Sequence, residues 1–204
     1  MAIKVIGITG GIASGKSTAS NMVREMGFTV IDADYASRVV VEPGQKAYGE
    51  IIDQFGESIL HEDGTLNREK LGAIIFTDEE KRKQLNQIVH PAVRTYMNEE
   101  REAAFERGEK IVFLDIPLLF ESKLTHMVDK TVLIYVDQDV QLQRLMARNN
   151  LTKEQAKARI NSQMPLSEKK ALADEVIDNN MDIDRMRSQL VSVLNKWGII
   201  STAH

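Results

Sequence analysis

The chain has 204 residues, of which 43% are hydrophobic, and its 26 Lys and Arg against 30 Asp and Glu give a net charge of −4. This is enough for one domain, or for one domain with a sizeable insertion, and the absence of cysteine excludes disulfides, thiolate metal sites and cysteine nucleophiles. A slightly acidic chain with no long apolar run, and with an N-terminus unlike a signal peptide, is expected to be cytoplasmic and to bind neither nucleic acid nor membrane.

Short apolar runs, most of them rich in β-branched residues, predict five strands of a covered parallel sheet. They are Ile3–Ile8, Phe28–Ile31, Ile111–Leu114, Val132–Val136 and Val176–Ile177. Amphipathic helical patterns lie between them, the clearest at Ala19–Met26 and Ile183–Trp197. The alternation of strand and helix predicts an α/β fold, a three-layer sandwich around a doubly wound sheet.

The first strand runs directly into a glycine-rich loop. Gly10–Ser17 fits the pattern G-x-x-x-x-G-K-[ST] between a strand and a helix. Glycines let backbone N–H groups point at phosphate oxygens, and the following helix adds its positive end. We call this segment the phosphate loop. It predicts nucleoside triphosphate binding by residues Gly10, Gly11, Ala13, Ser14, Gly15, Lys16, Ser17 and Thr18.

Two side chains of the phosphate loop have predicted roles of their own. Lys16 is expected to reach the β- and γ-phosphates, and the Ser17 hydroxyl to bind Mg²⁺. We expect Lys16 at the exposed end of a helix, where only bound phosphate needs its charge. On that ground Lys16→Ala is predicted to abolish activity and to leave the fold intact.

Two carboxylates follow the second strand, in the order Asp32-Ala33-Asp34. Strand alternation would put Asp32 and Asp34 on one face, at the carboxyl edge of the sheet where α/β proteins bind ligands. A carboxylate in that position suits the activation of an acceptor hydroxyl. The alternative is that one of the two only caps the next helix.

The chain between Glu42 and Lys110 contains helical patterns and no convincing strand. Pro91 is predicted to begin a helix, with His90 just before it. Because this stretch is far longer than a crossover requires, we expect an inserted helical subdomain over the carboxyl edge of the sheet.

A second, smaller insertion is basic. Asn149–Lys170 is rich in Lys, Arg and Gln and is expected to form a mobile lid. Arg144 and Arg148 are four residues apart on the helix that leads into it, so they share a helix face. Such cations would close over a migrating phosphoryl group. A solvated helix often carries a pair of this kind, so the assignment depends on position.

A phosphate loop alone does not separate a kinase from a GTPase switch or a motor-type ATPase. Asn195–Gly198 is the nearest string to a guanine reader and lacks its aspartate, and Asp53–Gly56 spells D-x-x-G inside a helical pattern. Larger ATPases usually need more chain and a second ATPase signature. These observations favour a small-molecule kinase.

Several pieces, in order along the chain, resemble the dephospho-coenzyme A kinases. They are Thr9–Ser17, Ile31–Asp34 followed by Arg38, Val41–Gly44, His90-Pro91, Pro117–Glu121, Gln163 and Ala173–Asn179. One departure is Arg148-Asn149-Asn150, where the family often has Arg-Asp-Gly or Arg-Asp-Asp. It touches only the hinge of the expected lid.

The resemblance implies a P-loop kinase with a nucleotide-binding core (1–36, 109–140 and 172–204), a helical acceptor subdomain (37–108) and a lid (141–171). It implies transfer of the ATP γ-phosphate to the ribose 3′-hydroxyl of dephospho-coenzyme A, the last step of coenzyme A biosynthesis. ATP and Mg²⁺ would be required, and we expect a monomer or weak oligomer. Composition and spacing alone reach only a small-molecule kinase. Another P-loop kinase therefore remains the alternative, with a GTPase-type switch less favoured.

The resemblance also gives roles to individual residues. Asp34 would orient or deprotonate the 3′-hydroxyl and Asp32 would assist Mg²⁺, while Lys16, Arg144 and Arg148 would act on the phosphates.

Arg38, His90 and Glu121 are further candidates for the acceptor site. His90 is equally explained as a helix cap or a core histidine, and Glu121 as a residue that fixes the loop after the third strand. By pattern alone, Asp115 at the end of the third strand is the rival of Asp34, and we expect Asp115→Asn to cost only about tenfold in rate.

Overall fold

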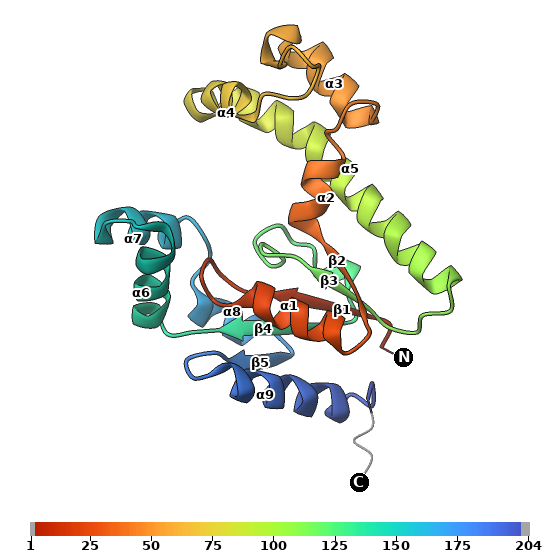
Figure 1. Ribbon diagram of the computed structural model, residues 1–204, viewed down its shortest axis with the longest axis vertical. Coiled ribbons are helices and arrows are strands. Elements are labelled where there is room, and N and C mark those ends of the chain that lie inside the picture. Colours follow the sequence, from red (N-terminus) through yellow and green to blue (C-terminus); the bar gives the residue numbers. More distant parts are fainter. Residues whose placement is uncertain (1–2, 201–204) are drawn as a thin grey trace. The chain divides into compact units, whose positions relative to one another are not determined.

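The computed structural model describes residues 3–200, which include a five-stranded sheet of order β2-β3-β1-β4-β5 (Figure 1). The strands are β1 (Val5–Thr9), β2 (Thr29–Asp32), β3 (Val112–Asp115), β4 (Lys130–Tyr135) and β5 (Glu175–Asp178). Strand β1 pairs in parallel with β3 and β4, and β4 pairs in parallel with β5. The predicted α/β fold with a five-stranded parallel sheet is therefore confirmed.

Helices fill the intervals between the strands. They are α1 (Lys16–Glu25), α2 (Ala33–Val39), α3 (Lys46–Phe55), α4 (Arg68–Thr77), α5 (Glu79–Glu106), α6 (Gln138–Asn149), α7 (Lys153–Asn161), α8 (Leu166–Leu172) and α9 (Ile183–Lys196), with short 3-10 turns at Glu57–Ile59 and Thr125–Met127. No helix in this part of the chain is both long and apolar enough to cross a bilayer.

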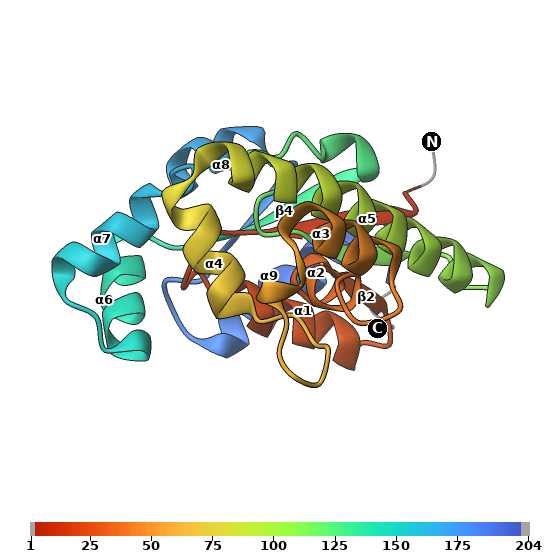
Figure 2. The same cartoon turned by 90° about the horizontal axis from the view of Figure 1, so that it is seen from above.

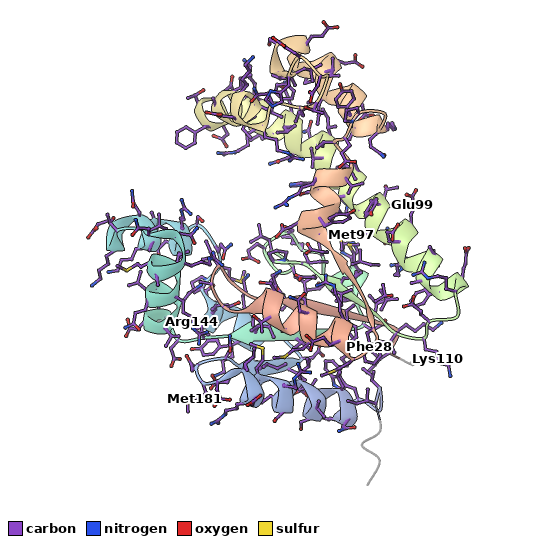
Figure 3. The ribbon with its side chains drawn as sticks, in the orientation of Figure 1. Phe28, Met97, Glu99, Lys110, Arg144 and Met181 are labelled. Carbon is purple, nitrogen blue, oxygen red and sulfur yellow. The ribbon has the colours of Figure 1, made fainter. Side chains whose placement is uncertain are left out.

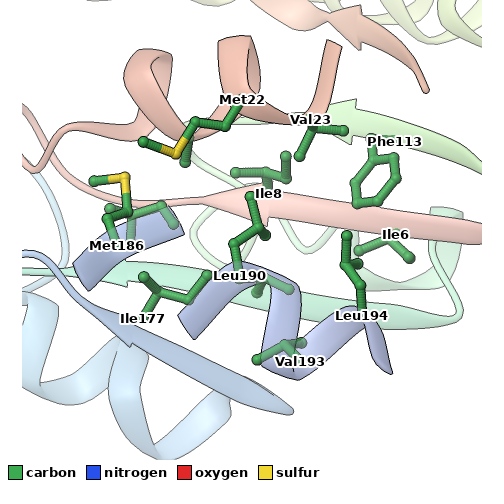
Figure 4. Close-up of a cluster of buried hydrophobic side chains, with 13 residues drawn as sticks. Ile6, Ile8, Met22, Val23, Phe113, Ile177, Met186, Leu190, Val193 and Leu194 are labelled. Carbon is green, nitrogen blue, oxygen red and sulfur yellow. The ribbon is translucent and has the colours of Figure 1, made fainter. Parts of the chain in front are cut away.

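Alternation along the buried strands assigns one face of the sheet to α1 and α9. Ile6 and Ile8 of β1 are fully buried with Met22 of α1 and Leu190 of α9 (Figure 4). On the other face, Leu133 of β4 packs in a cluster with a leucine of α8. Burying both faces explains why the strands are continuous apolar runs. The sheet thus presents the carboxyl end of β1 and the loop that follows it at one edge.

The chain divides into two compact units. One unit is Asp32–Ala103, and the other is formed by the chain before and after it. The Asp32–Ala103 unit is helical and has its own buried cluster, which includes Ile51, Ile59 and Leu71. Helices α6, α7 and α8 belong to the unit that contains the sheet. The predicted boundaries at 37 and 108, and a separate lid over 141–171, stay predictions.

Two local predictions are wrong. Strand β2 ends at Asp32, whose Oδ1 accepts hydrogen bonds from the N–H groups of Asp34 (2.8 Å) and Tyr35 (3.1 Å). This cap starts α2 at once, so Asp34 lies in the first turn of a helix and not on a strand.

Pro91 likewise lies inside the 28-residue helix α5 and does not begin it. Proline has no N–H, so the carbonyl of Gln87 loses its usual helical partner. Apolar residues on both sides of Pro91, among them Val89 and Val93, pack on the cluster of the helical unit and keep the helix continuous through this position.

Candidate nucleotide-binding site

The phosphate loop connects β1 to α1 and exposes a set of backbone donors. Within residues 3–200, no acceptor is bonded to the N–H groups of Ala13, Gly15, Lys16 and Ser17. The last two belong to the first turn of α1, where helix geometry leaves N–H groups without a partner inside the helix. Neighbouring open donors at the positive end of a helix make a site for phosphate oxygens.

Three other amides of the predicted set, those of Gly11, Ser14 and Thr18, form hydrogen bonds within the loop itself. Ser14 N–H donates to the Gly11 carbonyl and Thr18 N–H to the Gly15 carbonyl, each at 3.1 Å. The buried Ser14 hydroxyl oxygen also accepts from Gly11 N–H at 3.2 Å. These bonds hold the loop closed on itself.

Gly10 and Gly15 each require glycine for steric reasons. A Cβ on Gly10 would lie 2.4 Å from the Ser14 hydroxyl oxygen. Gly15 has a φ of +92°, and a Cβ there would lie 2.2 Å from Nδ2 of Asn179. That amide nitrogen donates to the Ser14 carbonyl at 2.8 Å, so the loop after β5 supports the phosphate loop from one side.

Ala13 also adopts a left-handed backbone conformation, with a φ of +59°. For a residue with a side chain this costs about 1–2 kcal/mol, so other contacts must hold it in place.

Lys16 forms an ion pair with Asp115, whose other carboxylate oxygen accepts a hydrogen bond from the Ser20 hydroxyl at 2.6 Å. The side chains of Lys16 and Asp115 are 14% and 2% exposed. The expectation that only bound phosphate needs the charge of Lys16 is therefore wrong. The adjacent β1 and β3 place Asp115 beside the phosphate loop, and removal of Lys16 would leave a buried carboxylate without its cation.

A lysine that the sequence reasoning missed lies under the loop. Lys169 of α8 is fully buried, and its Nζ donates to the carbonyls of Gly10 (2.8 Å) and Pro117 (3.1 Å). It also pairs with Oε1 of Glu121 at 2.8 Å. Nothing in the sequence distinguishes Lys169 from its exposed neighbour Lys170, because both read as charges of a basic insertion.

Glu121 is consequently tied to the sheet-containing unit. Its Oε1 also accepts from Met164 N–H at 3.2 Å, and its Oε2 is buried without a hydrogen-bond partner in residues 3–200. These contacts match the alternative role, in which Glu121 fixes the loop after β3. A role at the acceptor stays a prediction.

The two arginines predicted to act on the phosphates lie on α6, in the same unit as the phosphate loop. Figure 3 labels Arg144 on this helix. Arg144 is half-buried and Arg148 is exposed, with its Nε donating to Oδ1 of Asn149 at 2.9 Å. The helix ends at Asn149 and is capped by Asn150, whose φ of +50° is left-handed. Glycine and asparagine tolerate this conformation best, so the departure from the family pattern at Asn150 fits its position.

The other three residues predicted to handle the acceptor, Asp34, Arg38 and His90, belong to the helical unit. Asp34 and Arg38 are exposed and one turn apart on α2, where the Arg38 carbonyl accepts from Arg68 at 3.4 Å. His90 is exposed in the middle of α5, so it is neither a helix cap nor a core histidine. Their roles stay predictions.

Ser17 and Asp32 are the two side chains predicted to assist Mg²⁺, and they differ in their surroundings. Ser17 is exposed at the start of α1, as a hydroxyl ligand must be. Asp32 already uses Oδ1 to cap α2. In residues 3–200 no group of three or more acidic or histidine side chains forms a metal site by itself.

An amide-lined glycine loop between the first strand of a parallel sheet and its helix places the chain among the P-loop nucleotide-binding proteins. A family model of the dephospho-CoA kinases matches residues 4–185. Because that match covers most of the chain, the protein belongs to the dephospho-CoA kinase family, whose members are ATP-dependent kinases.

Individual relatives agree with this assignment. The dephospho-CoA kinase of Oceanobacillus iheyensis is 56% identical over 195 residues, which cover 96% of this chain and 98% of the relative. That of Geobacillus kaustophilus is 57% identical over 192 residues, covering 94% and 96%. Among solved structures, TT1252 from Thermus thermophilus has a TM-score of 0.80 at 34% identity, covering 96% of this chain and 98% of its own. The dephospho-CoA kinase from Campylobacter jejuni has a TM-score of 0.72 at 30% identity, covering 94% and 96%.

Proposed function

We propose that this chain transfers the γ-phosphate of ATP to the ribose 3′-hydroxyl of dephospho-coenzyme A, giving coenzyme A and ADP. The observation that carries the proposal is the phosphate loop, with its open amides beside Lys16, in a chain that matches the dephospho-CoA kinase family over residues 4–185. A cytoplasmic location stays a prediction. A monomer or weak oligomer stays a prediction.

In this reaction the 3′-oxygen forms a bond to the γ-phosphorus. The bond between that phosphorus and the bridging oxygen of ADP breaks, and ADP leaves with the electron pair. The proton of the 3′-hydroxyl goes to a carboxylate. Since the transferred group carries its charge on three oxygens, catalysis depends on positioned cations and backbone donors more than on covalent chemistry.

The sheet-containing unit would bind the nucleotide. The open amides of the loop would hold the β-phosphate, and Lys16 would move from Asp115 toward the β- and γ-oxygens. Arg144 and Arg148 would neutralise charge on the phosphates. Mg²⁺ would neutralise phosphate charge when bound, and the exposed Ser17 hydroxyl, with its oxygen donor, fits the ligand preference of this ion.

The helical unit would supply the groups that act on the acceptor. Asp34 would accept the proton of the 3′-hydroxyl, a role that fits an exposed carboxylate on the first turn of α2. Arg38 and His90 are exposed in the same unit and would bind the acceptor. Asp32, with one oxygen occupied by the helix cap, would assist Mg²⁺ only through its other oxygen or through water.

The proposal is tested by measuring ADP formation with ATP and a panel of acceptors. Dephospho-coenzyme A should support turnover, whereas shikimate and nucleoside monophosphates, the acceptors of other P-loop kinases, should not. GTP without an acceptor tests for a switch-type GTPase. Turnover that is faster with another acceptor, or ADP release that needs no acceptor, would overturn the assignment.

A further inference from the structure

Both backbone groups of one phosphate-loop residue are held by side chains from outside the loop. Ile12 N–H donates to Oε1 of Gln163 at 2.8 Å, and Nε2 of Gln141 donates to the Ile12 carbonyl at 2.8 Å. The direction of each bond is fixed by the backbone, because an N–H only donates and a carbonyl only accepts. Position 163 must therefore supply an acceptor and position 141 a donor.

These two bonds set the direction of the next amide in the loop. The peptide bonds of residues 3–200 are all trans, so the Ile12 carbonyl and the Ala13 N–H lie in one peptide plane and point in opposite directions. With the carbonyl turned toward Gln141, the Ala13 N–H is turned away from it, and it is one of the open donors of the loop. Ala13, the residue that follows, is the one with the left-handed backbone conformation.

The two glutamines also bracket the helix pair that carries the arginines. Gln141 is in the first turn of α6 and Gln163 follows the end of α7, and the two helices lie side by side in both views (Figures 1 and 2). Ile12 itself packs against the small buried cluster of this helix pair, which includes Leu145 and Ile160.

Gly11 precedes Ile12 in the loop, and its lack of a side chain leaves room for Gln141. A Cβ on Gly11 would lie 2.9 Å from Nε2 of Gln141, so a side chain there would displace the donor. Gly11 is thus needed for the approach of Gln141, although its φ is not in the left-handed region.

We propose that Gln141 and Gln163 are positioning residues: they hold the Ile12 backbone so that the Ala13 amide faces the nucleotide phosphates, and they tie the phosphate loop to the α6–α7 helix pair. The proposal rests on the proposed function in assuming that the loop binds ATP and ADP. It assigns no contact between either glutamine and the nucleotide.

The chain allows a test in which the same substitution has opposite consequences at the two positions. Gln163→Glu keeps an acceptor for Ile12 N–H, whereas Gln141→Glu removes the donor and brings a carboxylate toward the Ile12 carbonyl. Both variants add the same charge on the two sides of one residue. Gln163→Met and Gln141→Met remove each bond without adding charge. Gln143→Glu, on an exposed position of the same helix, is the matched control.

Binding of ADP by isothermal titration calorimetry, and the unfolding midpoint of the nucleotide-free protein, are measured for each variant. Each Met variant should bind ADP about tenfold more weakly than the control, near the upper limit for a single hydrogen bond. Gln163→Glu should recover most of the affinity that Gln163→Met loses, and Gln141→Glu should bind no better than Gln141→Met. A purely structural role would lower the midpoint without this ordering.

Gln163 lines a cavity of about 510 Å³, so a methionine there should be accommodated without unfolding. If the variants at the buried Gln141 do not fold, the comparison of Gln163→Met with Gln163→Glu is sufficient to test the proposal. The inference is overturned if Gln163→Met binds ADP as tightly as the control, or if Gln163→Glu and Gln163→Met are equally weak. Failure of the unsubstituted chain to bind ADP would instead refute the proposed function.

Discussion

The ion pair between Lys16 and Asp115 predicts an asymmetric loss of stability when either partner is removed. Lys16→Met leaves Asp115, which is 2% exposed, with the Ser20 hydroxyl as its remaining side-chain partner. Removing one partner of a buried pair costs about 3–5 kcal/mol, and we expect about 3 kcal/mol here because one hydrogen bond remains. Asp115→Asn leaves Lys16, which is 14% exposed and can reach water, so the expected loss is smaller, about 1–2 kcal/mol.

The assay is urea unfolding of the nucleotide-free chain, followed by circular dichroism. The double variant Lys16→Met/Asp115→Asn should be more stable than the sum of the single losses predicts, because neither charge is then left alone. Ser20→Ala, which removes only a hydrogen bond to Asp115, is the control and should cost about 1 kcal/mol.

Nucleotide provides a second measurement on the same variants. In Asp115→Asn the phosphates of ADP can replace the missing carboxylate beside Lys16, so saturating ADP should raise the unfolding midpoint more than in the unsubstituted chain. Equal stability of Lys16→Met and the unsubstituted chain, or additive losses in the double variant, would refute this account of the pair.

Three further predictions concern other residues. Asp34→Asn should lower kcat by about 100- to 10,000-fold while ADP still binds, and a smaller loss than Asp115→Asn shows would reverse the assignment of the two aspartates. Arg144→Ala and Arg148→Ala should lower kcat by more than they raise the KM for ATP, and a change in KM alone would mean uniform binding. Asp174→Ala should cost about 1–3 kcal/mol, because it leaves the buried Thr131 N–H without an acceptor. Burial alone would raise the pKa of Asp174, but the hydrogen bonds from Lys130 and Thr131 outweigh it and hold that pKa below its usual value of 3.8. The charged form of Asp174 is the one that stabilises the fold. The difference in free energy of unfolding between the unsubstituted chain and Asp174→Ala should therefore have its full value above pH 3.8 and should shrink as the pH falls through the lowered pKa. A difference that does not depend on pH would contradict this origin.

The parts of the fold that depend on local pattern could be predicted from the sequence. Each strand is a short apolar run, and the phosphate loop combines glycines with Lys16 in a spacing that few other structures require. In the two places where the predicted secondary structure was wrong, specific interactions determined the structure instead of the sequence pattern. The cap from Asp32 began α2 before alternation could apply to Asp34, and apolar contacts on both sides carried α5 through Pro91.

The contacts that support the phosphate loop could not be predicted from the sequence, for a different reason. Gln141, Gln163 and Lys169 reach the loop across more than 120 positions of chain, and each is a polar residue in a basic, helical stretch. Such residues usually face solvent, and only the packing of α6, α7 and α8 shows that these three do not. The same holds for Lys16, whose partner Asp115 belongs to a different strand-loop connection.

The most direct test of the proposed reaction follows the phosphate itself. ATP labelled at the γ-phosphate is incubated with Mg²⁺, dephospho-coenzyme A and the full chain, and the labelled product is analysed by phosphorus NMR. The account predicts one labelled phosphate per ADP formed, attached to the ribose 3′-oxygen. Label released as free phosphate, or attached to any other hydroxyl, would contradict it.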